Sequence, residues 1–170
     1  IGAILHLTGS GAVWGQNARK GIELALPLIN NSGGINGKKV EVLFEDSKSV
    51  PTDSVSAFRK LIDVDKIQCS IVDMISSNVL ALAPIAEQNK IVILSPGASS
   101  PDITNAGEYT FRNWPSDAFQ GEELAKFVFG TKKIKKTAIL YIENAFGESL
   151  KKVFTATFEK SGGTVIVGTV

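Results

Sequence analysis

A chain of 170 residues is long enough for one sizeable domain, or for one complete lobe and part of a second. Hydrophobic residues make up 44% and charged residues 21% of the sequence, as in an ordinary globular protein. The formal net charge of +1 gives no global attraction to nucleic acid or to an anionic membrane, so we expect a small-molecule ligand and no nucleic-acid partner.

Short runs of β-branched and apolar residues alternate with helical patterns, which is the sequence form of βαβ units and a largely parallel sheet. In chain order, strands are expected at residues 1–7, 39–44, 69–75, 91–94, 109–112, 137–142 and 164–170. Helices are expected between them at residues 16–30, 52–63, 79–88, 118–129 and 147–160. Several strands are apolar at successive positions, as expected where helices cover both faces of a sheet. The pattern predicts an α/β fold with a doubly wound parallel sheet.

The two ends of the chain both fall within strand patterns. The chain opens on Ile1 without a Met, so we expect an N-terminus that has been trimmed or processed. The segment FRNWPSDAFQG, residues 111–121, is typical of a crossover with a proline bend and a helix capped by Ser116 or Asp117. The chain then stops on an apolar strand, which leaves sheet edges unpaired. We therefore expect an N-terminal fragment of a longer protein, with edges that allow self-association of the fragment.

Small and polar residues follow three of the expected strands, at the edge of a parallel sheet where ligands bind. These loops are TGSGAVWG (8–15), SSN (76–78) and SPGASS (95–100). Serine hydroxyls and helix-start N–H groups supply the donors that a desolvated carboxylate needs, and one residue of 76–78 is expected to cap the next helix. Gly97, Ala98 and Ser99 are small enough to let a ligand reach the main chain. Serine and glycine are also common in turns, so a purely structural role is the alternative.

The sequence disfavours dinucleotide binding, nucleophilic catalysis and metal binding. In GSGAVWG the third glycine of a dinucleotide fingerprint falls at Trp14, and the acidic pair Glu45 and Asp46 lies much farther along than the usual distance of about 20 residues. His6 is the only histidine, lies within a strand and has no G-x-S-x-G partner motif, which favours a structural role. Cys69 is the only cysteine, and no metal-binding cluster is present. We expect no cofactor, no metal and no catalytic residue.

Four segments in this order and spacing resemble the type I periplasmic binding proteins of the branched-chain amino-acid transporter group. They are GGINGKKV, ISSNVLALAPIAEQNKIVILSPGASSPDIT, FRNWPSDAFQG and ENAFGE, and the resemblance covers essentially the whole chain. It implies two α/β lobes of Rossmann or flavodoxin-like type, joined by a hinge, that close on a small ligand, often an amino acid. It also implies that residues 1–115 form lobe one without its returning segment, and that residues 116–170 begin lobe two.

The resemblance also implies a set of ligand contacts. The family's carboxylate-binding serine matches Ser76, and the next loop, which offers a backbone carbonyl and a hydroxyl, matches Gly97 and Ser99. The aromatic residue of the first loop matches Trp14, and the aromatic residue before a glycine in lobe two matches Phe146, which lacks the phenol hydroxyl common there. Without the resemblance, both aromatic residues would be expected in the core.

Asp73 stands where the family usually carries glycine, and a buried structural acid is favoured over one that reaches the cleft. The acidic residue that pairs with a ligand's ammonium group would lie beyond Val170. The expected function is capture of a branched-chain or related amino acid, without chemistry, by the solute-binding component of an ABC transporter, with a membrane permease as partner. The alternatives are the ligand-sensing domain of a receptor and a flavodoxin-like enzyme or redox domain. The implied location is periplasmic or extracellular, including a cell-surface lipoprotein.

Overall fold

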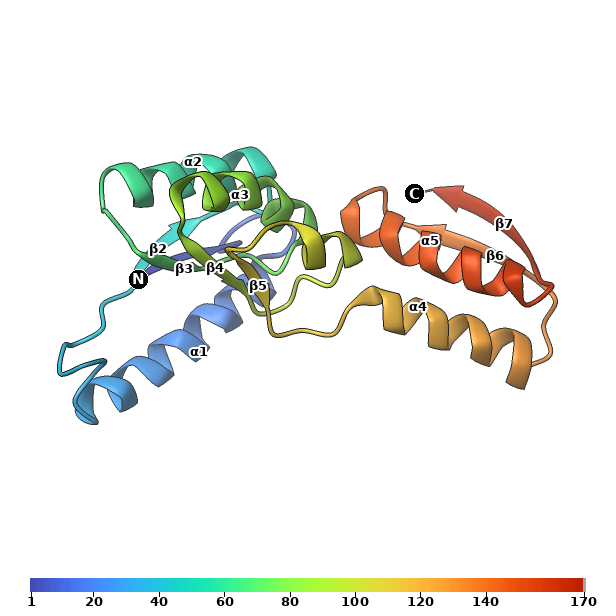
Figure 1. Cartoon of the computed structure of the whole chain (residues 1–170), viewed down its shortest axis with the longest axis horizontal. Coiled ribbons are helices and arrows are strands. Elements are labelled where there is room, and N and C mark those ends of the chain that lie inside the picture. Colours follow the sequence, from blue (N-terminus) through green and yellow to red (C-terminus); the bar gives the residue numbers. More distant parts are fainter. Residues whose placement is uncertain (170) are drawn as a thin grey trace.

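The computed structural model describes residues 1–169 and arranges them in two parallel sheets (Figure 1). The first sheet has the order β2-β1-β3-β4-β5 and consists of β1 (Gly2–Leu5), β2 (Leu43–Asp46), β3 (Cys69–Ile71), β4 (Val92–Ser95) and β5 (Thr110–Arg112). Its helices are α1 (Ala12–Asn31), α2 (Pro51–Asp63), α3 (Ser76–Asn89) and the short 3-10 helix η1 (Pro101–Asn105). The second sheet and its helices consist of β6 (Lys136–Tyr141), β7 (Thr164–Thr169), α4 (Asp117–Lys126), the π-helical turn η2 (Phe127–Thr131) and α5 (Ala145–Lys160).

Neighbouring strands of the first sheet all run parallel. β1 lies between β2 and β3, so the strand order changes direction there. Figure 1 shows α1 on one face of the sheet and α2 and α3 on the other. This arrangement confirms the predicted doubly wound α/β fold. Such a sheet opens a crevice beyond the carboxyl ends of the strands at the switch point, here β1 and β3.

The core of the first sheet lies between the strands and the helices α2 and α3. Pro51 occupies the first turn of α2, and Asp53 lies near the positive end of its dipole, so both favour a helix start there. On the inner face of α2, Phe58 and Leu61 are fully buried. They belong to one apolar cluster with residues of the strands and of α3, including Ile4, Val72, Val79, Leu82 and Ile93. Burial of each such side chain stabilises the fold by roughly 1.5–3 kcal/mol, and the cluster holds the ends of β1, β3 and β4 together.

Two helices begin at least three residues earlier than the sequence patterns predict, while the other three begin within two residues of the predicted starts. α1 starts at Ala12 rather than at residue 16, and α3 starts at Ser76 rather than at residue 79. Tertiary hydrogen bonds fix the small and polar residues at both starts. Ser49 Oγ accepts the N–H of Gly11 at 3.0 Å, and Ser76 Oγ accepts the N–H of Ser100 at 3.2 Å. Local patterns assign such residues to loops because they contain no information on these partners.

Three strands differ from the predicted ranges, while the described ends of β4 to β7 agree within one residue. β1 ends at Leu5 rather than at residue 7. β2 begins at Leu43 rather than at residue 39, and β3 ends at Ile71 rather than at residue 75. The carboxylate of Asp73 accepts the N–H of Ile75 at 3.3 Å and so replaces a strand hydrogen bond with a local turn. The last predicted strand residue, Val170, lies outside the described residues.

The segment between β5 and α4 joins the two sheets, and the predicted boundary between the lobes, at residues 115 and 116, falls within it. The division into lobes stays a prediction. Ser116 caps α4, as predicted, because its Oγ accepts the N–H of Ala118 at 3.3 Å. Within residues 1–169, no further strand covers the outer edges at β2 and β5 or those of the β6-β7 pair. The helices of this part of the chain include none that is long and apolar enough to cross a bilayer.

Candidate functional site

Two of the loops that the sequence singles out meet at the carboxyl ends of β3 and β4. Ser76 is the first residue of α3, and its Oγ accepts the N–H of Ser100 from the loop after β4. Ser99 is therefore held beside the start of α3. The topology brings these serines together because β3 and β4 are parallel neighbours, whose carboxyl ends lie at the same edge of the sheet.

Both predicted serines are buried and already hydrogen-bonded. Ser76 is 3% exposed and Ser99 is 7% exposed. Ser99 Oγ donates to Asp117 Oδ2 at 2.9 Å, so its hydroxyl serves a carboxylate of the protein in this structure. A contact between either hydroxyl and a ligand stays a prediction, and it requires the ligand to take over these hydrogen bonds.

Ser77 carries the more accessible hydroxyl at the start of α3. Asn78 is fully buried and Ser76 nearly so, whereas Ser77 is half-buried, and within residues 1–169 its hydroxyl forms no hydrogen bond. Successive helical residues point about 100° apart, so a start at Ser76 turns Ser77 away from its buried neighbours. The sequence analysis included Ser77 in the loop 76–78 but named Ser76 as the ligand contact, because the resemblance matches the family's serine to that position. The prediction that one of these residues caps α3 was wrong, since Ile75 is the N-cap and has no side-chain cap bond.

Gly97 lies in the loop after β4 and is half-buried. The N–H groups of Gly97 and Ala98 donate to Ser95 Oγ at 3.4 and 3.0 Å. A Cβ atom at residue 97 would lie 2.8 Å from Met74 Cγ, so packing against Met74 already requires a residue without a side chain. The absence of a side chain at Gly97 is therefore explained by packing. Contact between a ligand and the main chain of Gly97 stays a prediction.

The two predicted aromatic residues lie at the surface. Trp14, in the first turn of α1, is 68% exposed, and Phe146, in the first turn of α5, is 41% exposed. The alternative that both rings belong to the core is therefore wrong. Next to Phe146, a Cβ on Gly147 would lie 2.1 Å from the carbonyl oxygen of Ile142, which fixes the close turn that presents the ring. That both rings face one ligand stays a prediction.

The loop with Ser99 is clamped by Arg112 at the end of β5 and by Asp117 at the start of α4. Arg112 Nη1 donates to the carbonyl oxygens of Ser99 and Ser100 at 3.1 and 2.7 Å, and Nη2 donates to Thr104 Oγ1 at 2.6 Å. The N–H of Asp117 donates to the Ser99 carbonyl at 2.9 Å. Burial raises the pKa of Asp117, although the Ser99 hydroxyl and the charge of Arg112 oppose the rise. Sequence reasoning considered Asp117 only as a helix cap and missed both clamping residues.

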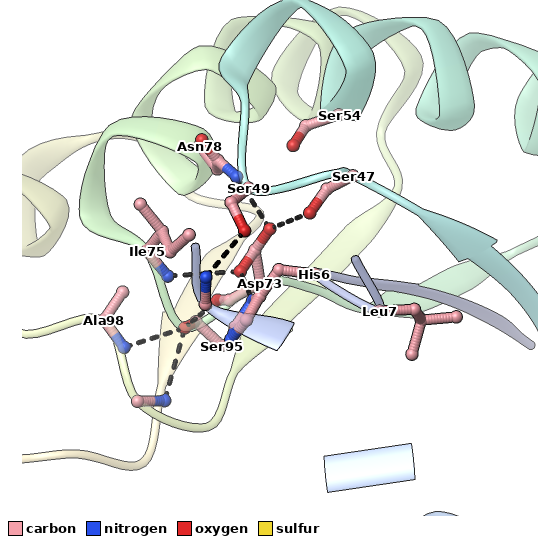
Figure 2. Close-up of polar contacts among 12 residues, drawn as sticks. His6, Leu7, Ser47, Ser49, Ser54, Asp73, Ile75, Asn78, Ser95 and Ala98 are labelled. Carbon is pink, nitrogen blue, oxygen red and sulfur yellow. Dashed lines mark hydrogen bonds and ion pairs between the residues drawn. The ribbon is translucent and has the colours of Figure 1, made fainter. Parts of the chain in front are cut away.

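A buried polar network underlies the serine loops (Figure 2). His6 is 1% exposed and pairs through Nδ1 with the fully buried Asp73, which confirms the structural role favoured for both residues. Ser47 Oγ and Asn78 Nδ2 donate to Asp73 Oδ2 at 2.5 and 2.7 Å. Burial alone raises the pKa of Asp73, but the bonds from His6, Ser47 and Asn78 outweigh it and lower the pKa below its ordinary value of 3.8. A nucleophilic serine would bond to the histidine, whereas Ser47 bonds to the aspartate.

Two grooves are lined by residues other than those of the loops 76–78 and 95–100. One of about 820 Å³ runs along α5 and reaches Pro101 and Asp102 of η1. Another of about 510 Å³ lies between α4, β6 and α5, and Phe146 is the one predicted site residue that lines either groove. Among the residues that the structure describes, no group of three or more His, Cys, Asp or Glu side chains could hold a metal ion.

Comparison with known proteins identifies similar chains. A family model described as a periplasmic binding protein matches residues 1–170. A Leu/Ile/Val-binding protein homologue of Brucella melitensis is 34% identical over 168 residues, which cover 98% of this chain and 45% of the relative.

Solved structures show the same similarity. A leucine binding protein from Thermotoga maritima superposes with a TM-score of 0.91 at 28% identity, over 99% of this chain and 48% of that one. An ABC-transporter solute binding protein from Rhodopseudomonas palustris, in complex with 3,4-dihydroxybenzoic acid, has a TM-score of 0.88 at 26% identity, over 99% and 46% of the two chains. This chain thus spans less than half the length of these relatives.

Proposed function

Because this chain belongs to the periplasmic binding protein family, we propose that it takes part in capturing a small carboxylate-bearing ligand for an ABC transporter, without chemistry. The observation that supports this most directly is the meeting of the start of α3 with the loop after β4, held by the hydrogen bond between Ser76 and Ser100. This junction lies beyond the carboxyl ends of parallel strands, where open α/β sheets bind ligands.

The start of α3 has the groups that a carboxylate needs. Within the described chain, no side chain caps this helix end, and the N–H of Asn78 already donates to the carbonyl of Ile75. The N–H groups of Ser76 and Ser77 and the Ser77 hydroxyl can therefore donate to an anion. Each hydrogen bond to a charged group contributes roughly 1.5–3 kcal/mol. Two or three such bonds, with burial of an apolar side chain, account for micromolar affinity, which corresponds to about 8 kcal/mol.

The ligand proposed is a branched-chain or related amino acid. The similar proteins are named for leucine, isoleucine and valine, or were crystallised with 3,4-dihydroxybenzoic acid, and all of these molecules carry a carboxylate. In our proposal, the carbonyl of Gly97 accepts a hydrogen bond from the ammonium group. The rings of Trp14 and Phe146 cover the apolar side chain.

The proposal includes the setting of the whole protein. Residues 1–115 act as lobe one, residues 116–170 begin lobe two, and the cleft between the lobes closes on the ligand. A membrane permease receives the loaded protein in the periplasm or at the cell surface, where a lipid anchor would hold a lipoprotein form. The family match and the names of the relatives support this setting.

Titration calorimetry of the full-length protein tests the ligand class. The probes are L-leucine, L-isoleucine, L-valine and 3,4-dihydroxybenzoate, and we expect micromolar or tighter binding of at least one amino acid. Ser77→Ala should weaken that binding about tenfold, equivalent to about 1.4 kcal/mol. If only 3,4-dihydroxybenzoate binds, the ligand is an aromatic acid rather than an amino acid. If none of the probes binds, the proposal is refuted.

A further inference from the structure

We propose that Asp73 is a positioning residue for ligand capture, which fixes the start of α3 and the Gly97–Ala98 loop in the geometry that binds the ligand. The inference rests on the proposed function, because it assumes that these two segments hold the ligand. Asp73 lies just beyond β3, three residues before Ser76, and is fully buried. None of its own atoms needs to touch the ligand.

The carboxylate of Asp73 contacts four residues, from the end of β1, the loop after β2 and the start of α3 (Figure 2). Oδ1 pairs with His6 Nδ1 at the end of β1 and accepts the N–H of Ile75 at 3.3 Å. Oδ2 accepts Ser47 Oγ from the loop after β2 and Asn78 Nδ2 from the first turn of α3, at 2.5 and 2.7 Å. Two of these partners, Ile75 and Asn78, flank the serines at the helix start.

The carbonyl oxygen of Asp73 is connected by hydrogen bonds to the loop after β4. It accepts Ser95 Oγ–H at 2.6 Å, and Ser95 Oγ in turn accepts the N–H groups of Gly97 and Ala98 (Figure 2). One residue thus determines the position of α3 through its side chain and the position of the Gly97–Ala98 loop through its backbone. A shift of Asp73 would change both segments together.

The network is arranged around an ionised carboxylate. Every one of its side-chain contacts brings a donor to Asp73. The amide of Asn78 is committed to this task, because its Nδ2 faces Asp73 while its Oδ1 is buried and has no hydrogen-bond partner within the described residues. A buried carboxylate costs free energy unless such donors surround it, and with them it becomes a rigid anchor.

The test compares full-length wild type with Asp73→Asn, which keeps the size of the side chain and removes its charge. The matched control is Asp53→Asn, which removes a partly exposed carboxylate of α2 that contacts Lys48 and lies outside the network. Titration calorimetry with L-leucine, L-isoleucine and L-valine measures affinity. Amide-resolved hydrogen exchange of the free protein follows Ile75, Gly97 and Ala98.

We expect Asp73→Asn to lose about tenfold or more in affinity while it remains folded, and to exchange these amides about tenfold faster. The control Asp53→Asn should match wild type in ligand affinity and in the exchange rates of these three amides. A residue that only stabilises the fold would leave the affinity of the folded protein unchanged and would accelerate exchange across the whole sheet. That outcome, or wild-type affinity with wild-type exchange, would overturn the proposal.

A second variant covers the case in which Asp73→Asn does not fold. Ser95→Ala leaves the carboxylate and its donors in place and removes only the link to the Gly97–Ala98 loop. We expect faster exchange at Gly97 and Ala98, unchanged exchange at Ile75, and weaker binding. Unchanged exchange at the loop would overturn the proposal. If wild type binds none of the probes, the proposed function fails, and the exchange data alone decide whether Asp73 positions the two segments.

Discussion

Replacement of Gly97 by alanine separates two reasons for the missing side chain at this position, packing against Met74 and contact with a ligand. The new Cβ would lie 2.8 Å from Met74 Cγ and 2.9 Å from Met74 Cβ. An ordinary contact between carbon atoms is about 3.5 Å, so Met74 or the loop must move by roughly 0.7 Å. Rotation of the Met74 side chain cannot relieve the contact with its Cβ.

Overpacking of this kind destabilises a protein by about 1–3 kcal/mol. Met74 is only half-buried, and its outer atoms can turn away, so we expect Gly97→Ala to fall in the lower part of that range. The double variant Met74→Ala with Gly97→Ala removes the Cγ contact and should recover part of the stability lost in Gly97→Ala, relative to Met74→Ala alone. The contact with the Cβ of residue 74 remains in the double variant, so the loop that carries the Gly97 carbonyl stays displaced. If that carbonyl binds the ligand, affinity should be about tenfold weaker in both variants that carry the methyl group.

Urea unfolding and titration calorimetry of the full-length protein measure the two effects separately, with Met74→Ala as the matched control. Loss of affinity that persists in the double variant would support a ligand contact at Gly97. Wild-type affinity in the folded Gly97→Ala protein would show that this glycine serves packing alone, and the proposed ligand geometry at the loop would be refuted.

Further changes have expected outcomes that follow from burial and geometry. The pKa of Asp73 lies below 3.8, so its ionised form stabilises the fold above that pH, and Asp73→Asn should lower the free energy of unfolding at neutral pH by an amount that shrinks in acid. Burial raises the pKa of Asp117, so Asp117→Asn should leave that free energy unchanged or higher at neutral pH, and a clear loss in urea unfolding would contradict this assignment. Gly15→Ala would place a Cβ 2.2 Å from the His6 carbonyl oxygen and should lower the melting temperature by several degrees, whereas an unchanged melting temperature would argue against this close approach. Residues 1–170 alone should self-associate through unpaired sheet edges, and light scattering from a stable monomer would refute that expectation.

The order of strands and helices could be predicted because it depends on local patterns. Apolar runs such as residues 91–94 and the amphipathic spacing of α2 are complete within a few positions, and they place β4 and α2 within one residue of the structure. Element starts that depend on distant partners could not be predicted in the same way. α1 and α3 begin where Ser49 and Ser100 meet small residues from other segments, and those contacts span 38 and 24 positions.

The place of the site follows from topology, whereas its hydrogen bonds depend on pairs that no local pattern contains. His6 and Asp73 are 67 positions apart, yet the sequence does carry a signal for their contact. Each is the single histidine or acidic residue in a mostly apolar run, IGAILHL and CSIVDMI, and a buried polar side chain needs a hydrogen-bond partner. If β1 and β3 are adjacent and parallel, as in a doubly wound sheet, both residues lie just beyond the carboxyl ends of neighbouring strands. The pairing of one histidine with one aspartate, which anchors the loops proposed to bind the ligand, could therefore be deduced once the strand order is known.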